Sequence, residues 1–396
     1  MRVLVTAAAV SLLLATLSGD AFPRSAGAVV GEQRIGLVLA TWGPEPVTVD
    51  EARAAVAETV AYVRDASFGK TSLSVEVIGW TRALPRRPRG CDTQGVDETI
   101  RRSVDLSRFT LVAYLIPSMD CPWSGAYYPP GVWMLGRISK DLFAHELGHN
   151  YGVREEGSAW ICSTSCRAEN YASPYSVMGH GSGDFNAFEK WRFGWITREG
   201  PTLADGEYQI ARIDRPSGLA HALYVVSGAD EYWIEYRPEV PWPVVHAGAN
   251  DARVTSSRFP QRNLLLAGAR SAKFSVPKAF EVVMLDSDST EATLRFRWTD
   301  RTRPSRPRLD VIASGRWVTL RFPATDTGSG VDRYEVSIGP RYRVVVATSE
   351  VVDGELVGHD AVYRARLARG VHRVVVTPVD RAGNRGPAAV RSVRVR

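Results

Sequence analysis

The sequence lacks the features that would indicate a membrane-spanning, repeat or cysteine-ligated metal protein. After residue 28 no stretch is long and apolar enough to cross a bilayer, which takes about 20 consecutive apolar residues. No segment recurs with a fixed period. Only four Cys are present, and no two form a Cys-x-x-Cys pair, the usual spacing of a cysteine-based zinc site. We therefore expect no membrane span and no metal held by Cys.

Lysine is scarce, and the positive charge is unevenly distributed. The formal net charge of +6 and the pI near 9.2 would by themselves be compatible with nucleic-acid binding. Residues 303–396, however, hold 17 Arg and no Lys against nine Asp and Glu, which leaves a balance of −2 for the rest of the chain. Because the excess belongs to the C-terminal quarter alone, we expect no nucleic-acid partner.

The first 28 residues have the order of a secretory signal peptide. Arg2 supplies a positive start, Val3 to Leu17 is an uncharged apolar run, and small residues follow up to Ala28. The apolar run is shorter than a membrane span, so the sequence predicts cleavage after Ala28 and a secreted, extracellular protein.

The four Cys fit an oxidising compartment. Cys91, Cys121, Cys162 and Cys166 are even in number and all lie in the first half of the chain. Four Cys allow three different connectivities. We favour Cys91–Cys121 and Cys162–Cys166, because the second pair closes a very short loop.

The periodicity of apolar residues divides the chain into regions. Residues 29–199 mix apolar strands at 35–40, 72–80 and 109–116 with helices at 50–65, capped by Asp50, and at 139–151. Residues 200–300 contain short alternating strands, 301–308 have the composition of a linker, and 309–396 have the strand spacing of a β-sandwich of roughly seven strands. The predicted class is α+β, with a catalytic-type domain before two β-rich regions.

One helix carries the residues best suited to chemistry. His145 and His149 are four residues apart in His-Glu-Leu-Gly-His, so both imidazoles share one helix face and can bind one ion. Glu146 lies beside them, placed to accept a proton from an activated water. Two imidazoles suit zinc, and a catalytic zinc site takes three protein ligands and keeps one open position. We therefore predict a Zn²⁺ site with Glu146 as general base.

Residues after this helix extend the motif. Gly152 can adopt the positive φ that ends the helix, and Glu155 follows three residues later. Met178 lies in Ser-Val-Met-Gly, a tight turn of the kind that can form the floor of a zinc site. Glu155 is our first choice for the third ligand, followed by His180 and then Glu156, because carboxylate and imidazole both ligate zinc.

The order of these motifs resembles the gametolysin-like secreted metallopeptidases of the metzincin clan. Besides the zinc helix, the similarity includes Trp42-Gly-Pro44, Cys121-Pro-Trp-Ser-Gly125-Ala126, the approach to Met178, and Tyr232 to Arg237, and it covers about residues 34–298. It implies a zincin-like catalytic domain that cleaves a polypeptide substrate. Metzincins normally place His, less often Asp, at the position of Glu155. The alternative is therefore a secreted binding or adhesion protein that retains a degenerate zincin scaffold.

Other residues have secondary roles in these predictions. Tyr171 and Tyr175 are candidates to assist the reaction. The turns at Asp326 to Gly330 and Asp380 to Asn384 resemble loops of fibronectin type III or Ig-like modules. The Arg-rich surface of this C-terminal module would allow weak contact with an anionic cell-surface polymer.

Overall fold

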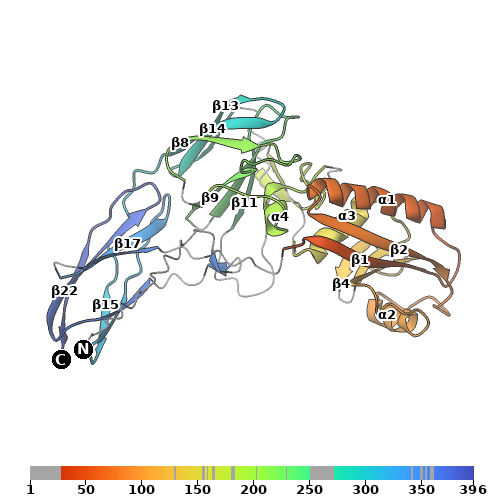
Figure 1. The fold of residues 1–396 in the computed structure, drawn as a ribbon, viewed down its shortest axis with the longest axis horizontal. Helices are drawn as coiled ribbons and strands as arrows, with labels where there is room; N and C mark the ends of the chain where they lie inside the picture. The colour runs from red at the N-terminus through yellow and green to blue at the C-terminus, as the bar shows by residue number, and fades with distance from the viewer. Residues whose placement is uncertain are drawn as a thin grey trace, which may run out of the picture.

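The structure is a computed structural model that describes residues 28–396, except 129–130, 154–156, 158, 163–165, 180–182, 202, 229, 250–271, 340–341, 348–350, 353–354 and 357–360. The signal-peptide prediction thus falls, apart from Ala28, outside the described residues. Three regions follow one another along the molecule in chain order, from α1 to β22 (Figure 1).

The N-terminal region is a five-stranded sheet in the order β2-β1-β3-β5-β4, covered by helices on both faces (Figure 1). The strands β1, β2, β3 and β5 are parallel, and the edge strand β4 is antiparallel to β5. Its elements are β1 (Gly31–Ala40), α1 (Val49–Ala66), β2 (Thr71–Thr81), α2 (Thr93–Arg101), β3 (Leu111–Ile116), β4 (Gly125–Tyr128), β5 (Gly131–Leu135) and α3 (Lys140–Asn150).

The apolar runs form strands because both faces of the sheet are buried. In β1, Ile35, Leu37 and Leu39 pack with α1 and α3, whereas Val38 and Ala40 pack with α2. The strands predicted at 35–40, 72–80 and 109–116 and both predicted helices are present.

The start of α1 corrects one prediction. The N-cap is Thr48 and not Asp50, because the Thr48 hydroxyl accepts a hydrogen bond from the Glu51 amide while the Glu51 carboxylate accepts one from the Thr48 amide. This reciprocal capping box satisfies both amides, so the helix begins at Val49 and Asp50 lies within its first turn.

The disulfide between Cys91 and Cys121 is present, as predicted. It joins the start of α2 to the segment that leads into β4. In the second predicted pair, Cys162 and Cys166 are backbone partners in the hairpin of β6 (Ala159–Cys162) and β7 (Cys166–Glu169). Their side chains lie outside the described residues.

Replacing Cys91 by Ser is expected to lower the free energy of unfolding by about 2–4 kcal/mol, because the bond closes a loop of 30 residues in the unfolded chain. Urea unfolding of the two proteins measures the difference. Chemical reduction of the disulfide in the wild type should lower the free energy of unfolding by the same amount. A difference below about 1 kcal/mol would mean that the disulfide contributes little to stability.

The middle region packs two small sheets face to face. One contains β9, β10 and β11, and the other has the order β12-β13-β14-β8. Its strands are β8 (Gly206–Ala211), β9 (Ala222–Ser227), β10 (Asp230–Glu235), β11 (Val244–Ala249), β12 (Lys273–Val276), β13 (Phe280–Ser287) and β14 (Glu291–Trp298). The helix before them, α4 (Ala187–Arg192), packs in the core of the N-terminal region.

The β9–β11 sheet contributes to two hydrophobic cores. Tyr224 and Trp233 join the core of the N-terminal region, whereas Leu223 and Ile234, next to them in sequence, join the core formed with the β8–β14 sheet. Successive side chains of β9 and β10 point to opposite faces of their sheet, so one face of this sheet packs against the region that carries the His145–His149 helix.

The C-terminal region is a β-sandwich of two antiparallel sheets, β15-β16-β21 and β18-β17-β22-β23, with a small β19–β20 hairpin. Its elements are β15 (Asp310–Ser314), β16 (Trp317–Arg321), β17 (Val331–Ile338), β18 (Tyr342–Ala347), β19 (Val351–Val352), β20 (Glu355–Leu356), β21 (Val362–Arg366), β22 (Gly370–Asp380) and β23 (Ala389–Val395).

Together these regions confirm the predicted α+β class and the predicted C-terminal β-sandwich. Among the helices that the structure describes, none combines the length and apolar character needed to cross a bilayer.

Candidate metal centre

Helix α3 places His145 and His149 on one face. Its N-cap is Ser139, whose hydroxyl accepts a hydrogen bond from the Leu142 amide at 3.2 Å. Phe143 and Leu147 anchor the opposite side in the core. The helix ends where Gly152 adopts a φ of +104°, a conformation that costs other residues free energy but not glycine. This agrees with the helix end expected from the sequence.

Backbone carbonyls orient both imidazole rings. Nδ1 of His145 lies 3.0 Å from the Val177 carbonyl oxygen, and Nδ1 of His149 lies 2.8 Å from the Val153 carbonyl oxygen. A carbonyl can only accept, so each Nδ1 must carry the proton, which leaves the lone pair of each neutral ring on Nε2. The two Nε2 atoms face each other at 3.2 Å.

This separation fits a shared metal ion. Two lone pairs directed at one another repel unless a cation lies between them, as in a metal complex. Two nitrogens that each lie ~2.0–2.1 Å from zinc in a tetrahedral site are about 3.3–3.4 Å apart. The donor type, the tautomers and the spacing therefore all suit a zinc ion.

Glu146 lies beside the two His and is almost fully buried, with 3% of its surface exposed. Gly125, the first residue of β4, makes room for its carboxylate. A Cβ atom added at Gly125 would lie 2.5 Å from Oε1 of Glu146 and 2.5 Å from Cδ1 of Leu142. The backbone of the edge strand thus limits where this carboxylate can lie.

Replacing Gly125 by Ala is therefore expected to displace the Glu146 carboxylate and to reduce kcat/KM for any reaction that uses it by about tenfold or more. The metal content should stay unchanged, because neither His contacts the added methyl group. The matched control is Gly79→Ala, where a Cβ atom meets nothing within 4 Å. Equal activity of both variants would show that Gly125 does not position Glu146.

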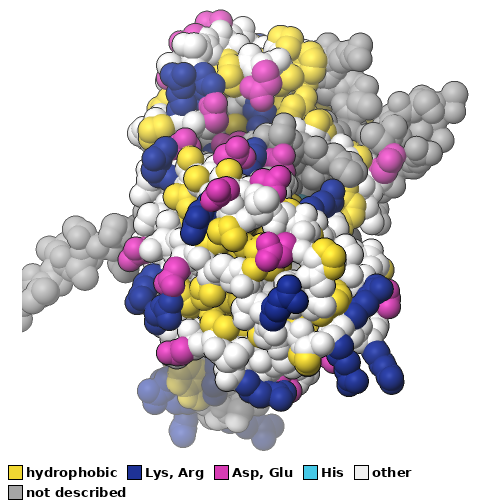
Figure 2. Space-filling view, turned by 90° about the vertical axis from the view of Figure 1, so that its right-hand side faces the viewer, with side chains coloured by type: hydrophobic (Ala, Val, Ile, Leu, Met, Phe, Trp, Pro, Cys, Tyr) yellow, Lys and Arg dark blue, Asp and Glu magenta, His cyan; other side chains and the backbone are white. Residues whose placement is uncertain are grey.

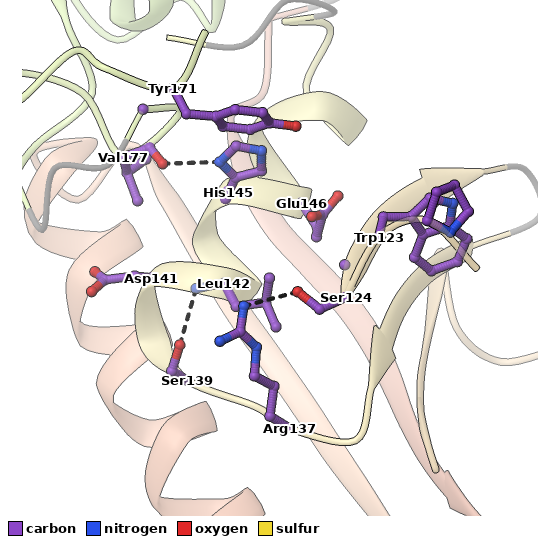
Figure 3. Close-up of a pocket in the computed structure, with 13 residues that line it drawn as sticks. Trp123, Ser124, Arg137, Ser139, Asp141, Leu142, His145, Glu146, Tyr171 and Val177 are labelled. Carbon is purple, nitrogen blue, oxygen red and sulfur yellow. Dashed lines mark hydrogen bonds between the residues drawn. The ribbon is translucent and has the colours of Figure 1, made fainter. Parts of the chain in front are cut away.

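Gly125, His145 and Glu146 line a cleft of about 530 Å³ (Figure 3). One wall is the segment before β4, the floor is α3, and the other wall includes Tyr171, Val177 and Gly179. The described lining residues are Pro122, Trp123, Ser124, Gly125, Arg137, Ser139, Asp141, Leu142, His145, Glu146, Tyr171, Val177 and Gly179.

The two candidate tyrosines differ in position. The Tyr171 ring stacks on the His145 ring with centroids 6.0 Å apart, and the residue has a φ of +62°, which is uncommon for Tyr. Tyr175 does not line the described cleft. Arg237 lies over its ring at 5.5 Å and binds its carbonyl oxygen at 2.8 Å. Only Tyr171 is therefore placed to meet a bound ligand.

Met178 is fully buried against α3. A Cβ atom added at Gly148 would lie only 2.3 Å from its Sδ atom, so the turn and the helix touch directly. The Met178 carbonyl oxygen accepts a hydrogen bond from the Gly157 amide at 2.7 Å. The turn thus packs beneath the helix that carries both His.

A buried polar network, which the sequence did not predict, stabilises the turn at Met178. The Ser176 hydroxyl donates to the Glu189 carboxylate at 2.7 Å and accepts from the Met178 amide at 3.0 Å. Burial raises the pKa of Glu189 to about 7, although the hydrogen bond from Ser176 opposes this rise. The Glu189 carboxylate on α4 thereby fixes, through Ser176, the backbone at Met178.

An ion pair from the middle region completes the network. Arg237 Nε lies 2.5 Å from Oε1 of Glu235, and Nη2 donates to the Tyr175 carbonyl. The Ala187 amide of α4 donates to Oε2 of Glu235 at 2.6 Å, and Nε2 of His246 lies 3.1 Å from Oε1. Burial alone would raise the pKa of Glu235, but Arg237 and His246 outweigh it and lower the pKa to about 2.

The candidate third ligands Glu155, Glu156 and His180 lie outside the described residues. Their described neighbours are held close to the site. Val153 accepts the His149 hydrogen bond, and Gly157 donates to the Met178 carbonyl.

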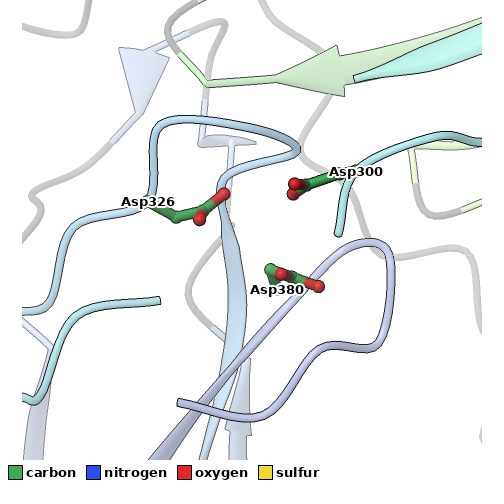
Figure 4. A group of neighbouring side chains, drawn as sticks. All are labelled: Asp300, Asp326 and Asp380. Carbon is green, nitrogen blue, oxygen red and sulfur yellow. The ribbon is translucent and has the colours of Figure 1, made fainter. Parts of the chain in front are cut away.

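A group of three carboxylates, Asp300, Asp326 and Asp380, lies at the junction of the middle and C-terminal regions (Figure 4). Their oxygens lie within 4.8 Å of one another and could hold a metal ion. Asp326 accepts hydrogen bonds from two amides of its own turn, and Asp300 accepts one from the Ser329 amide. Burial raises the pKa of Asp380 to about 6. The two turns predicted from the sequence thus meet in space.

The surface of the N-terminal region carries charges of both signs. Figure 2 shows Lys and Arg interspersed with Asp, Glu and uncharged side chains on this end of the molecule. Nucleic-acid-binding proteins instead present a continuous basic patch or stripe, so this face gives no support for such a partner.

Comparisons with known proteins find only distant similarity. No family model and no curated protein matches the sequence. Among solved structures, wild-type OgpA from Akkermansia muciniphila aligns over 94% of this chain and 98% of its own, at 10% identity and a TM-score of 0.24. The PKD1 domain of the Vibrio cholerae metalloprotease PrtV covers 24% of this chain and 98% of its own, at 15% identity and a TM-score of 0.19.

The fibronectin(III)-like modules of Clostridium thermocellum CbhA align over 43% of this chain and 87% of their own, at 12% identity and a TM-score of 0.18. TM-scores this low do not establish a shared fold. The function is therefore inferred from the site residues alone.

Proposed function

We propose that this protein is a secreted zinc-dependent endopeptidase of the gametolysin-like, metzincin type. The observation that carries the proposal is the pair of Nε2 atoms of His145 and His149 at 3.2 Å, with each Nδ1 proton directed to a carbonyl and with Glu146 beside His145 in the lining of the cleft. Met178 beneath the helix and Gly152 at its end support the metzincin type.

A zinc ion held by His145 and His149 would supply Lewis acidity, which makes an attacking water more acidic and polarises the scissile carbonyl. Glu146 accepts the proton from the water as it attacks and then delivers that proton to the leaving nitrogen. Its burial keeps bulk water from competing for the proton. The Tyr171 hydroxyl lies at the cleft above His145, where it can donate to the developing oxyanion (Figure 3).

A polypeptide fits the cleft as a substrate. β4 is the last strand of its sheet, and Gly125 at its start lines the cleft. An extended peptide can add to such an edge by backbone hydrogen bonds. This pairing would bring a peptide bond past Glu146 without requiring a particular side chain at every position.

We assign the third zinc ligand to Glu155, with His180 and Glu156 as alternatives. The support is that Val153 binds His149 and Gly157 binds the Met178 turn, so both ends of this short segment lie at the site. Replacing Glu155 by Ala should weaken zinc binding by more than the roughly 10- to 100-fold caused by loss of an outer-shell partner. Titration with a competing chelator measures this affinity. Unchanged affinity would reassign the ligand, with His180→Ala tested next.

The predicted signal peptide and the Cys91–Cys121 disulfide support export to an oxidising compartment. The proposal is tested by incubating the purified protein with casein. Degradation that stops on addition of a chelator and resumes with zinc supports it. A protein that binds zinc but cleaves none of a broad set of polypeptides would instead be the non-catalytic binding protein named above.

A further inference from the structure

One positive side chain lies in the cleft at the end opposite His145. Arg137 follows β5, and its exposed guanidinium reaches the wall formed by the segment before β4, where Nη2 donates to the Ser124 hydroxyl at 2.8 Å (Figure 3). Within the part of the chain that the structure describes, Arg137 makes no ion pair. Four of its five donors therefore remain available to a ligand.

The two carboxylates that line the cleft do not neutralise this charge. Asp141 lies 2.7 Å from the ammonium group of Lys140, and its carboxylate points away from Arg137. Glu146 is buried beside Gly125. A guanidinium binds a carboxylate through two parallel hydrogen bonds, which makes an acidic side chain its best-matched ligand.

The separation of Arg137 from His145 along α3 places an acidic side chain bound to Arg137 close to the scissile bond. From its N-cap, Ser139, to His145 the helix α3 rises by about 9 Å, and Arg137 precedes Ser139 by two residues. One residue of extended peptide spans about 3.3–3.6 Å, and a Glu or Asp side chain adds several more ångströms. Leu142 lines the cleft between the two ends and suits the methylene groups of such a side chain.

We propose that Arg137 selects substrates that carry an acidic residue within two positions of the scissile bond. Arg137 is thus a specificity-determining residue, and the substrate class is an acidic polypeptide segment. This inference rests on the proposed function, because it concerns the same cleft.

The first test maps cleavage sites by mass spectrometry after digestion of a mixture of unstructured peptides. The wild type should show Glu or Asp enriched within two residues of the cut bonds. For matched peptides that differ only by Glu or Gln at that position, kcat/KM should favour Glu by about tenfold, and the preference should shrink as salt is raised.

Variants separate charge recognition from a general effect on the cleft. Arg137→Ala should abolish the preference for Glu, Arg137→Lys should retain part of it, and Arg137→Glu should favour peptides with Lys instead. Arg53→Ala, an exposed residue of α1 outside the cleft, is the matched control and should keep the wild-type preference. A preference for Glu that survives in Arg137→Glu would overturn the inference.

Binding without turnover gives an independent measure. The Glu146→Gln variant, titrated with the fluorescently labelled Glu and Gln peptides, should bind the Glu peptide about tenfold more tightly, and adding Arg137→Ala should remove the difference. Cleavage of polypeptides without an acidic preference would overturn this inference alone. Absence of any cleavage by the wild type would overturn the proposed function as well.

Discussion

Replacing Glu146 by Gln is expected to reduce kcat/KM for peptide hydrolysis by about 10²–10⁴-fold, because the amide cannot accept the proton of the attacking water. Gln has nearly the same shape, so packing against Gly125 and the fold should be retained. Zinc content should also be unchanged, since the two His rings are held by Val177 and Val153 and not by Glu146. A fluorogenic peptide assay with metal analysis of the same samples measures both quantities.

The matched control is Glu58→Gln, an exposed carboxylate on α1. It should have wild-type activity. If Glu146→Gln retained more than about a tenth of the wild-type rate, a different residue would have to act as the general base.

Replacing Glu235 by Leu is expected to lower the free energy of unfolding by about 3–5 kcal/mol, because it leaves the buried charge of Arg237 without its closest carboxylate. Arg237 and Glu235 are 4% and 0% exposed, so water cannot compensate for the loss. The change should also loosen the turn at Met178, since Arg237 binds the Tyr175 carbonyl only three residues earlier. Urea unfolding measures the stability, and zinc affinity reports on the turn.

The double variant Glu235→Leu with Arg237→Met should be more stable than Glu235→Leu alone, because it removes both charges. A double variant that is less stable than Glu235→Leu alone would show that the two side chains are not coupled.

The stabilisation by Glu235 should depend on pH. The pKa of Glu235 is lowered to about 2 from a usual value of 4.5, so the contribution of its carboxylate to stability is complete above pH 4.5 and is lost as the pH falls toward 2. The stability difference between the wild type and Glu235→Gln should therefore shrink over that range.

Local patterns were sufficient to predict the part of the site that lies on one helix. His145, Glu146 and His149 are neighbours because residues four apart share a helix face, whatever surrounds them. The buried strands of the N-terminal sheet were predictable for a similar reason, since continuous apolar runs of that length fit strands covered on both faces.

Contacts between distant segments could not be predicted in this way. Ser176 and Glu189 meet only because α4 folds back under the turn, and Arg237 reaches Tyr175 across 62 residues of sequence. Asp326 and Asp380 each have the composition of an ordinary turn, and nothing local shows that both face Asp300. The short strand β4, with Gly125 and three further residues, has too few positions to show a period.

Arg137 illustrates the same limit. In the sequence it is one of 44 Arg, and only the packing of the β5–α3 connection against Ser124 places it in the cleft. Its proposed role therefore comes from its position and its lack of an ion pair within the described residues.

The central claim is that His145 and His149 together hold zinc. The most direct test is the zinc content of the purified wild-type protein and of the His149→Ala variant, after both have been dialysed against the same zinc buffer. We predict one zinc per chain in the wild type and none in the variant, with both proteins folded by circular dichroism. A wild type without zinc, or a variant that retains it fully, would contradict the proposed site.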